Sequence, residues 1–255
     1  QERYIICNAD EGEPGTFKDR VLLTEKADLV FEGMTLAARA VESKTGILYL
    51  RAEYRYLQPY LESVLQARKQ AGLCEQLDIR IQLGAGAYIC GEESSLISSC
   101  EGKRGEPKNR PPFPVESGYL GFPTVVNNVE TFCNAAQIVK YGADWFRSFG
   151  TDKSSGTKLL SVCGDCTRPG IFELPMGVTL NEVLNLAGAM NPAAVQVGGA
   201  SGEMISRTDF HRRLCFEDLP TAGAIMIFSE TRNILEIVDY FLHFSIARRE
   251  YSLQI

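Results

Sequence analysis

Residues 78–100 read DIRIQLGAGAYICGEESSLISSC and join three local patterns in one run. Asp78–Leu83 alternates polar and apolar side chains, which is typical of a β-strand. Gly84–Gly91 is rich in glycine and predicts a turn, and Glu92–Cys100 predicts a helix with acids in its first turn. A strand that turns directly into a helix is the repeating unit of an α/β fold.

The same succession of patterns runs upstream of this stretch. Strands are expected over Tyr4–Cys7 and Ile47–Leu50, and helices from Asp28, as N-cap, and over Tyr56–Ala71. The polar segment Asn8–Arg20 predicts a loop. We therefore predict an α/β fold with a Rossmann-like, mostly parallel sheet and helices on its faces. Ligands of such sheets bind beyond the carboxyl ends of the strands, where both glycine-containing loops lie.

The pattern changes in the second half of the chain. Gly102–Pro123 predicts a long functional loop, Val129–Lys140 a helix and Gly150–Gly156 a linker. The segments that follow indicate a small α+β domain of the β-grasp (ubiquitin-like) kind. They are strands at Leu159–Val162, Gly170–Leu174, Ala194–Val197 and Ala224–Phe228, and a helix at Thr179–Leu186 capped by Thr179 and Glu182.

Three domains follow from these boundaries. Residues 1–150 are expected to form an α/β domain, residues 156–230 the β-grasp domain, and residues 231–255 the start of a truncated helical domain that begins with a helix from Thr231. The chain begins without Met and almost at once in a strand, which we interpret as a piece cut from a longer protein.

Composition excludes several classes of protein. Of 255 residues, 45% are hydrophobic and 23% charged, as in an ordinary globular protein, and the net charge of −6 argues against nucleic acid as a partner. No apolar run approaches the about 18 residues of a membrane span, and no signal peptide is evident. The 8 cysteines therefore favour a reducing cytoplasm. We interpret the close pair Cys163 and Cys166 as structural, and predict no metal site.

The glycine-rich turn and the acids after it suggest a cofactor site. Gly84, Gly86 and Gly91 let backbone amides face a phosphate or a ring edge, although their spacing differs from the dinucleotide fingerprint and from a P-loop. Glu92 and Glu93 either compensate the helix dipole or bind a ribose, an amide or the edge of a flavin.

Two further loops carry polar groups. Asp10, Glu11, Glu13 and Asp19 suit sugar hydroxyls better than a metal ion, because Gly, Pro and Lys interrupt the cluster. A basic stretch, Lys103 to Arg110, suits phosphate contact.

Aromatic and amide side chains complete the candidate site. Phe113, in a stiff proline-rich segment, suits stacking on a base or nicotinamide. Asn127 and Asn128 precede a helix. One is expected to be its N-cap, and the amides suit the alternating donors and acceptors of a flavin edge.

At these residues the chain resembles the NADH-binding FMN/iron–sulfur flavoprotein subunit of respiratory complex I. The same module serves as the diaphorase subunit of NAD-reducing hydrogenases and NAD-dependent formate dehydrogenases. Gly142–Gly150 and the segment after it look closest to the soluble hydrogenase type. The resemblance rests on the blocks Asn8–Arg20, Gly84–Glu93, Glu101–Pro107, Arg110–Pro114 and Pro123–Thr131.

The resemblance implies FMN and NAD(H) in one site of an NADH dehydrogenase or diaphorase-type oxidoreductase. Family members transfer a hydride between NAD(H) and FMN, and then pass single electrons to the iron–sulfur clusters of a larger complex. The residues that would hold FMN are Asn8, Asp10, Glu11, Tyr88, Gly91, Glu92, Asn127, Asn128 and Thr131. Those that would meet NAD(H) are Glu13, Glu93, Arg110 and Phe113, with Glu93 as the candidate catalytic residue. Arg110 stands where the family usually has Lys.

Two departures from the family bear on function. The first glycine-rich loop of the family is expected before Gln1, and the ligands of the family's 4Fe–4S cluster are expected after Phe244, where residues 245–255 read SIARREYSLQI instead. The alternatives are therefore a truncated, non-catalytic fragment that binds partners or a nucleotide, and a stand-alone flavin reductase. The expected partners are NADH or NAD⁺ and iron–sulfur subunits of a complex I-like, hydrogenase or formate dehydrogenase assembly. The expected location is cytoplasmic, or peripheral to the inner membrane through such a complex.

Overall fold

The computed structural model describes residues 2–74 and 76–253, with side chains up to Phe244. The side chains of the divergent tail, 245–255, lie outside the described residues. The chain divides into two compact units. The first unit comprises Gln1–Gly12 and Asp19–Lys140, and the second comprises Glu13–Lys18 and Tyr141–Ile255.

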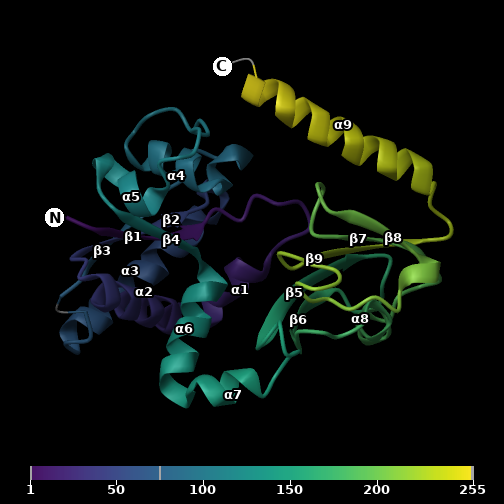
Figure 1. Ribbon diagram of the computed structural model, residues 1–255, viewed down its shortest axis with the longest axis horizontal. Coiled ribbons are helices and arrows are strands. Elements are labelled where there is room, and N and C mark those ends of the chain that lie inside the picture. The colour runs from purple at the N-terminus through teal and green to yellow at the C-terminus, as the bar shows by residue number, and fades with distance from the viewer. Residues whose placement is uncertain (1, 75, 254–255) are drawn as a thin grey trace. The chain divides into compact units, whose positions relative to one another are not determined.

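The sheet of the first unit is parallel throughout, in the order β3-β2-β1-β4 (Figure 1). Its strands are β1 (Tyr4–Ala9), β2 (Thr45–Leu50), β3 (Asp78–Leu83) and β4 (Thr124–Asn128). Its α-helices are α1 (Lys18–Glu25), α2 (Ala27–Val41), α3 (Gln58–Gln70), α4 (Glu93–Cys100), α5 (Pro114–Ser117) and α6 (Val129–Tyr141). Short 3₁₀ turns are η1 (Ala52–Leu57), η2 (Tyr88–Gly91) and η3 (Tyr119–Gly121). This architecture confirms the predicted α/β fold.

Both faces of this sheet are covered, because alternate residues of each strand point to opposite sides. Ile5 of β1 is fully buried in a cluster with residues of α2 and α3, such as Phe31 and Leu61. Its neighbour Ile6 is fully buried in a second cluster, with Leu96 of α4. Figure 1 shows α2 and α3 on one face and α4 on the other. The apolar burial therefore fixes the strands so that their carboxyl ends meet at one edge.

The second unit contains a five-stranded mixed sheet in the order β6-β5-β9-β7-β8, with β5 and β9 parallel. Helix α8 packs on it through Leu180, Val183 and Leu184. The strands are β5 (Thr157–Gly164), β6 (Gly170–Pro175), β7 (Pro192–Val197), β8 (Glu203–Ser206) and β9 (Ala224–Ser229). The helices are α7 (Ala143–Arg147), α8 (Leu180–Ala187), the 3₁₀ turn η4 (Arg207–Asp209) and α9 (Ile234–Leu253). The predicted capping box is confirmed, since Thr179 and Glu182 bond reciprocally.

Several predicted boundaries were wrong. Lys26, not Asp28, is the N-cap of α2, because the chain continues from α1 almost without a break and Lys26 already donates its N–H to Leu22. Helix α1 begins at Lys18, inside the segment predicted as loop. The last helix begins at Ile234 rather than Thr231. Strands β4 and β8 and helices α5 and α7 were not predicted. Among the described residues no helix combines the length and apolar character needed to cross a bilayer.

Candidate functional site

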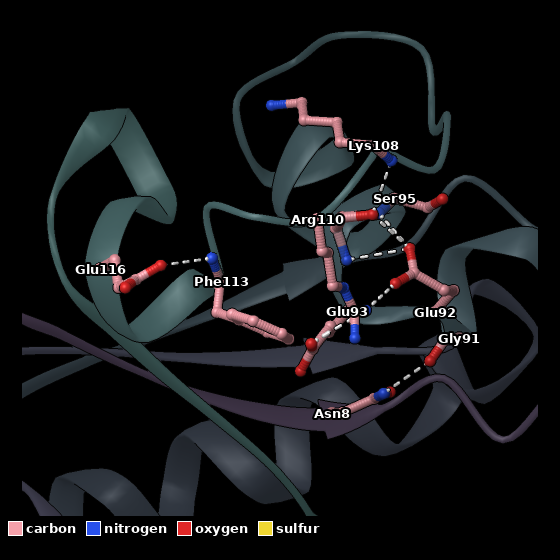
Figure 2. A network of polar contacts seen from close by, with 10 residues as sticks. Asn8, Gly91, Glu92, Glu93, Ser95, Lys108, Arg110, Phe113 and Glu116 are labelled. Carbon is pink, nitrogen blue, oxygen red and sulfur yellow. Dashed lines mark hydrogen bonds and ion pairs between the residues drawn. The ribbon is translucent and has the colours of Figure 1, made fainter.

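The candidate site begins where β1 and β4 end side by side. Asn8 and Asn128 are register partners at the carboxyl ends of these strands. Asn8 Nδ2 donates a hydrogen bond of 2.9 Å to the carbonyl of Gly91, which brings the glycine-rich turn to the end of β1 (Figure 2). Sequence blocks 83 residues apart therefore meet at the edge where an α/β sheet binds its ligands.

Asp10 carries an unsatisfied oxygen at this edge. Its side chain is only 8% exposed, and Oδ2 is buried with no hydrogen-bond partner among the described residues. A Cβ added at Gly91 would lie 3.4 Å from the Asp10 carbonyl and 3.9 Å from Oδ2, so the glycine keeps the space beside the carboxylate open. Burial raises the pKa of Asp10 to about 6; Arg51 opposes this rise and Glu53 adds to it.

Glu11, the next residue, is fully engaged by the protein itself. Its carboxylate accepts hydrogen bonds from the backbone N–H groups of Asp19 (2.8 Å) and Arg20 (3.2 Å) at the start of α1, and from the hydroxyl of Tyr54 (2.9 Å). Burial, followed by the nearby Asp19 carboxylate, raises the pKa of Glu11 against these hydrogen bonds. Arg51 also donates to the Glu11 carbonyl. Glu11 therefore ties the loop to α1, a role that its sequence context did not reveal.

Glu92 is the N-cap of α4. Its carboxylate accepts from the N–H groups of Ser94 (3.0 Å) and Ser95 (2.9 Å) and pairs with Arg110 (Figure 2). Partial burial works to raise the pKa of Glu92, but the hydrogen bonds from Ser94 and Ser95 and the pair with Arg110 outweigh it and hold the pKa below its ordinary value. The interpretation that these acids compensate the helix dipole is thus correct for Glu92.

Arg110 links both acids to the proline-rich loop. Its Nη2 also lies 2.9 Å from Oε1 of Glu93, and its guanidinium carbon lies 6.0 Å from the centre of the Phe113 ring. Phe113 is 48% exposed, so part of its ring is accessible for stacking. Glu93 is about one-third exposed and holds no other ion pair among the described residues. The predicted residues Glu92, Glu93, Arg110 and Phe113 are therefore brought together.

A small cavity of about 60 Å³, open to solvent, lies between this loop and α4. Its lining includes Ser94, Lys108, Arg110 and Pro112. The N–H of Lys108 donates to Ser94 Oγ (2.8 Å), which fixes the base of the loop to the first turn of α4. The loop is thus anchored at its root while its aromatic end stays exposed.

The paired asparagines have different surroundings. Asn128 Nδ2 donates to Asp19 Oδ2 (2.7 Å), and Asn128 Oδ1 accepts from the N–H of Glu130, so it caps α6 as predicted for one of the pair. The side chain of Asn127 is half-buried and makes no hydrogen bond within the described part of the chain. Thr131 is exposed in the first turn of α6, and Tyr88 packs against Gly12. An amide that lacks a protein partner at this edge, like Asp10 Oδ2, is available to a ligand.

Glu13 has partners of its own within the second unit. It belongs to the second unit, where its Oε1 accepts a hydrogen bond of 2.7 Å from the N–H of Ala200. Two glycines, Gly198 and Gly199, directly follow a predicted strand and so indicate a turn there. Nothing local in the sequence connects that turn to Glu13.

No group of three or more His, Cys, Asp or Glu side chains in the described residues is arranged to hold a metal ion. The acids considered for a metal, Asp10, Glu11, Glu13 and Asp19, do not form such a group. Cys163 and Cys166 are free thiols, and burial raises the pKa of both. A raised pKa disfavours the reactive thiolate, consistent with a structural role.

Fold and site together define a class of protein: a parallel α/β domain with polar side chains at the carboxyl edge of its sheet, followed by a β-grasp unit. The family described as the Nuo51 FMN-binding domain matches residues 1–137, and the SLBB domain matches residues 159–208. The chain therefore belongs to the family of the Nuo51 FMN-binding domain.

Individual relatives agree with this assignment. The chain is 56% identical over 254 residues to the NAD-reducing hydrogenase HoxS subunit alpha of Cupriavidus necator, covering 96% of this chain and 42% of that protein. It is 40% identical over 235 residues to an NADH-quinone oxidoreductase subunit of Escherichia coli (strain K12), covering 87% and 53%. The crystal structure of an NAD⁺-reducing NiFe hydrogenase in the H2-reduced state superimposes with a TM-score of 0.92 at 52% identity, covering 95% and 43%. The chain spans about half the length of the curated relatives it matches.

Proposed function

We propose that this chain is the flavoprotein part of an NADH-oxidising or NAD-reducing enzyme, with FMN and NAD(H) bound at the carboxyl edge of the parallel sheet. When bound, FMN supplies the chemistry that accepts a hydride from NADH and releases single electrons. Two relatives are named as an NAD-reducing hydrogenase subunit and an NADH-quinone oxidoreductase subunit. By that similarity, the partners are iron–sulfur subunits of such an assembly, and the location is cytoplasmic.

The observation that carries this proposal is the unpartnered Oδ2 of Asp10 beside Gly91. A buried carboxyl group without a partner is costly, and a ring nitrogen or a hydroxyl of FMN would satisfy it. Asn127 offers an amide at the same edge, and Asn8 keeps the glycine-rich turn in place through Gly91. The residues present therefore fit a planar group with alternating donors and acceptors.

The nicotinamide nucleotide is assigned to the neighbouring loop. Phe113 presents an open ring, suited to stacking on a base or on nicotinamide. Arg110 fixes the carboxylates of Glu92 and Glu93 in one arrangement, so that Glu93 can accept hydrogen bonds from ribose or from the nicotinamide amide. Glu93 is our candidate for the residue that orients the dinucleotide at the reacting edge.

Titration of the chain with FMN, followed by quenching of flavin fluorescence, tests the proposal. Gly91→Ala should weaken FMN binding at least about tenfold, because its Cβ fills the space beside Asp10. Gly170→Ala, at a glycine without a positive φ where an added Cβ meets no atom within 4 Å, should bind like the wild type. NADH should then bleach the bound flavin. Equal FMN affinity of the two variants would contradict the assigned site, and bound FMN that NADH cannot reduce would favour a binding module instead.

A further inference from the structure

The loop segment Glu13–Lys18 is grouped with the second unit, although Gly12 and Asp19 on either side of it belong to the first. It is held by hydrogen bonds at both ends of its turn. Glu13 Oε1 accepts from the N–H of Ala200 (2.7 Å), and Phe17 donates its N–H to the hydroxyl of Ser161 on β5 (3.0 Å). The segment is thus fastened to residues that lie 187 and 144 positions further along the chain.

The turn that receives Glu13 is held by contacts that do not involve the acid. Gly198 and Gly199 adopt φ angles of +88° and +78°, which only glycine adopts readily. The Gly199 carbonyl accepts hydrogen bonds from the buried amide of Gln196 (2.7 Å) and from the N–H of Gly202 (3.1 Å). These contacts fix the turn from inside and leave the N–H of Ala200 directed at the acid. Successive backbone amides in such turns form concave sites for anions.

Gly199 makes room for the carboxylate itself. A Cβ at Gly199 would lie 2.1 Å from Oε1 of Glu13 and 2.4 Å from Cδ. No side chain fits there while the acid is bound, so the Glu13 carboxylate occupies the volume that any other residue at position 199 would need. The complementarity is steric as well as electrostatic.

The middle of the segment is seated just as closely. Gly15 lies over β9 and β5: a Cβ there would be 2.9 Å from Cγ of Met226 and 3.6 Å from Sγ of Cys163. At the far end, a Cβ at Gly223 would lie 3.1 Å from Cδ of Lys18. The whole segment therefore rests on one surface of the β-grasp unit, and Glu13 provides its charged anchor.

We infer that the turn Gly198–Gly202 of the second unit is a carboxylate-binding turn that positions Glu13 and so fixes the segment Glu13–Lys18, which continues directly in sequence from Asp10 and Glu11. Pinning a glycine- and proline-containing loop in advance removes conformational freedom that a ligand would otherwise have to restrict. The capture of Glu13 stands on the contacts within the second unit. Only its consequence for cofactor binding rests on the proposed function.

Hydrogen exchange of the whole 255-residue chain, read by mass spectrometry, tests the capture. Glu13→Ala should accelerate exchange of the amides of Ala200 and Phe17 at least about tenfold. The amide of Ala200 loses its hydrogen-bond acceptor, and Phe17 lies in the segment that Glu13 anchors. Glu13→Gln keeps a hydrogen-bond acceptor, so its exchange rates should lie between those of the wild type and those of Glu13→Ala. Glu25→Gln, the same change at an exposed acid, should alter neither amide. Unchanged exchange at Ala200 in Glu13→Ala would overturn the inference.

A double-mutant cycle separates capture from simple strain in the turn. Gly199→Ala should accelerate exchange of residues 13–18 as much as Glu13→Ala does. In the Glu13→Ala background, Gly199→Ala should accelerate this exchange no further than Gly121→Ala does. Gly121 has nearly the same φ, +79°, but an added Cβ there meets no atom within 4 Å. Additive effects of Gly199→Ala and Glu13→Ala would refute the positioning role.

The FMN titration is read separately from exchange. If the wild-type chain does not bind FMN, the proposed function is refuted, but the coupling between Glu13 and Gly199 in the exchange experiment is unaffected. Normal FMN binding with no such coupling would end this inference and leave the function standing.

Discussion

Replacing Asp10 by Asn should stabilise the ligand-free protein at neutral pH and leave it unchanged in acid. The pKa of Asp10 is raised by burial from its ordinary value of 3.8 to about 6. The folded state therefore binds this proton more tightly than the unfolded state does, and stability falls as pH rises between these two values. Above about pH 6 the ionised carboxylate costs up to about 3 kcal/mol. Since the Asn amide also lacks partners, we expect a gain of about 1–3 kcal/mol.

Urea unfolding, followed by circular dichroism at several pH values between about 4 and 8, measures this gain. The difference between Asp10→Asn and the wild type should be near zero at the acid end, grow through about pH 5, and level off above about pH 6.5. Asp152→Asn, at an exposed acid, is the control and should show no such trend. An equal gain at both ends of the range would mean that Asp10 acts by shape rather than by charge, and our account of its pKa would be wrong.

Three other predictions concern packing, the binding loop and acid stability. Gly33→Ala should destabilise the chain by about 2–4 kcal/mol in urea unfolding, because its Cβ would lie 2.0 Å from the Phe132 carbonyl and helices α2 and α6 would have to separate. A loss of stability below about 0.5 kcal/mol would contradict this packing. Arg110→Lys should change stability by less than about 1 kcal/mol, since its ion pairs are partly exposed. It should weaken NADH binding about three- to tenfold, because Lys cannot bridge two carboxylates as Arg does. Calorimetric titration of the FMN-loaded chain measures this affinity, and an unchanged affinity would refute the prediction. Arg232 holds the pKa of Asp165 below its ordinary value, so this pair contributes stability that is present above the unfolded value and lost as pH falls through the folded one. Asp165→Asn should therefore lower the thermal midpoint at neutral pH and have no effect in strong acid, and the same loss at both would disprove the linkage.

The sequence predicted the parts of the fold that depend on period and apolar burial. The strand Asp78–Leu83 was predicted with its observed bounds, because its first residues alternate between an exposed and a buried face. Strand β4 was missed because only two of its five residues, Val125 and Val126, are apolar; its remaining length comes from pairing with β1. Strand β8 was missed for the same reason, and it depends on β7 for its hydrogen bonds. Pairing between distant segments leaves little trace in local composition.

The sequence indicated several residues that the structure brings together, but not the contacts among them. Glycine and acid spacing indicated the turn before α4, and one of the two asparagines was predicted to be a cap, which the structure shows to be Asn128. The hydrogen bond from Tyr54 to Glu11 was not predicted, because Tyr54 lies 43 residues away in a segment with no polar pattern of its own. The anchoring of Glu13 depends on a turn 187 residues further along the chain, and no local rule connects the two.

The acids at the edge of the sheet differ in how far the protein satisfies them, and this difference indicates their roles. Glu11 and Glu92 each accept backbone hydrogen bonds at the start of a helix, so they stabilise the frame whether or not a ligand is present. Asp10 has a buried oxygen without a partner in the described chain, and its burial costs free energy until something donates to it. A fold retains such a cost most readily where a ligand removes it, and sites shaped for binding are commonly less stable when empty. Because the neighbouring Gly91 leaves space beside the same oxygen, Asp10 is the acid at which cofactor binding and folding stability are most directly coupled.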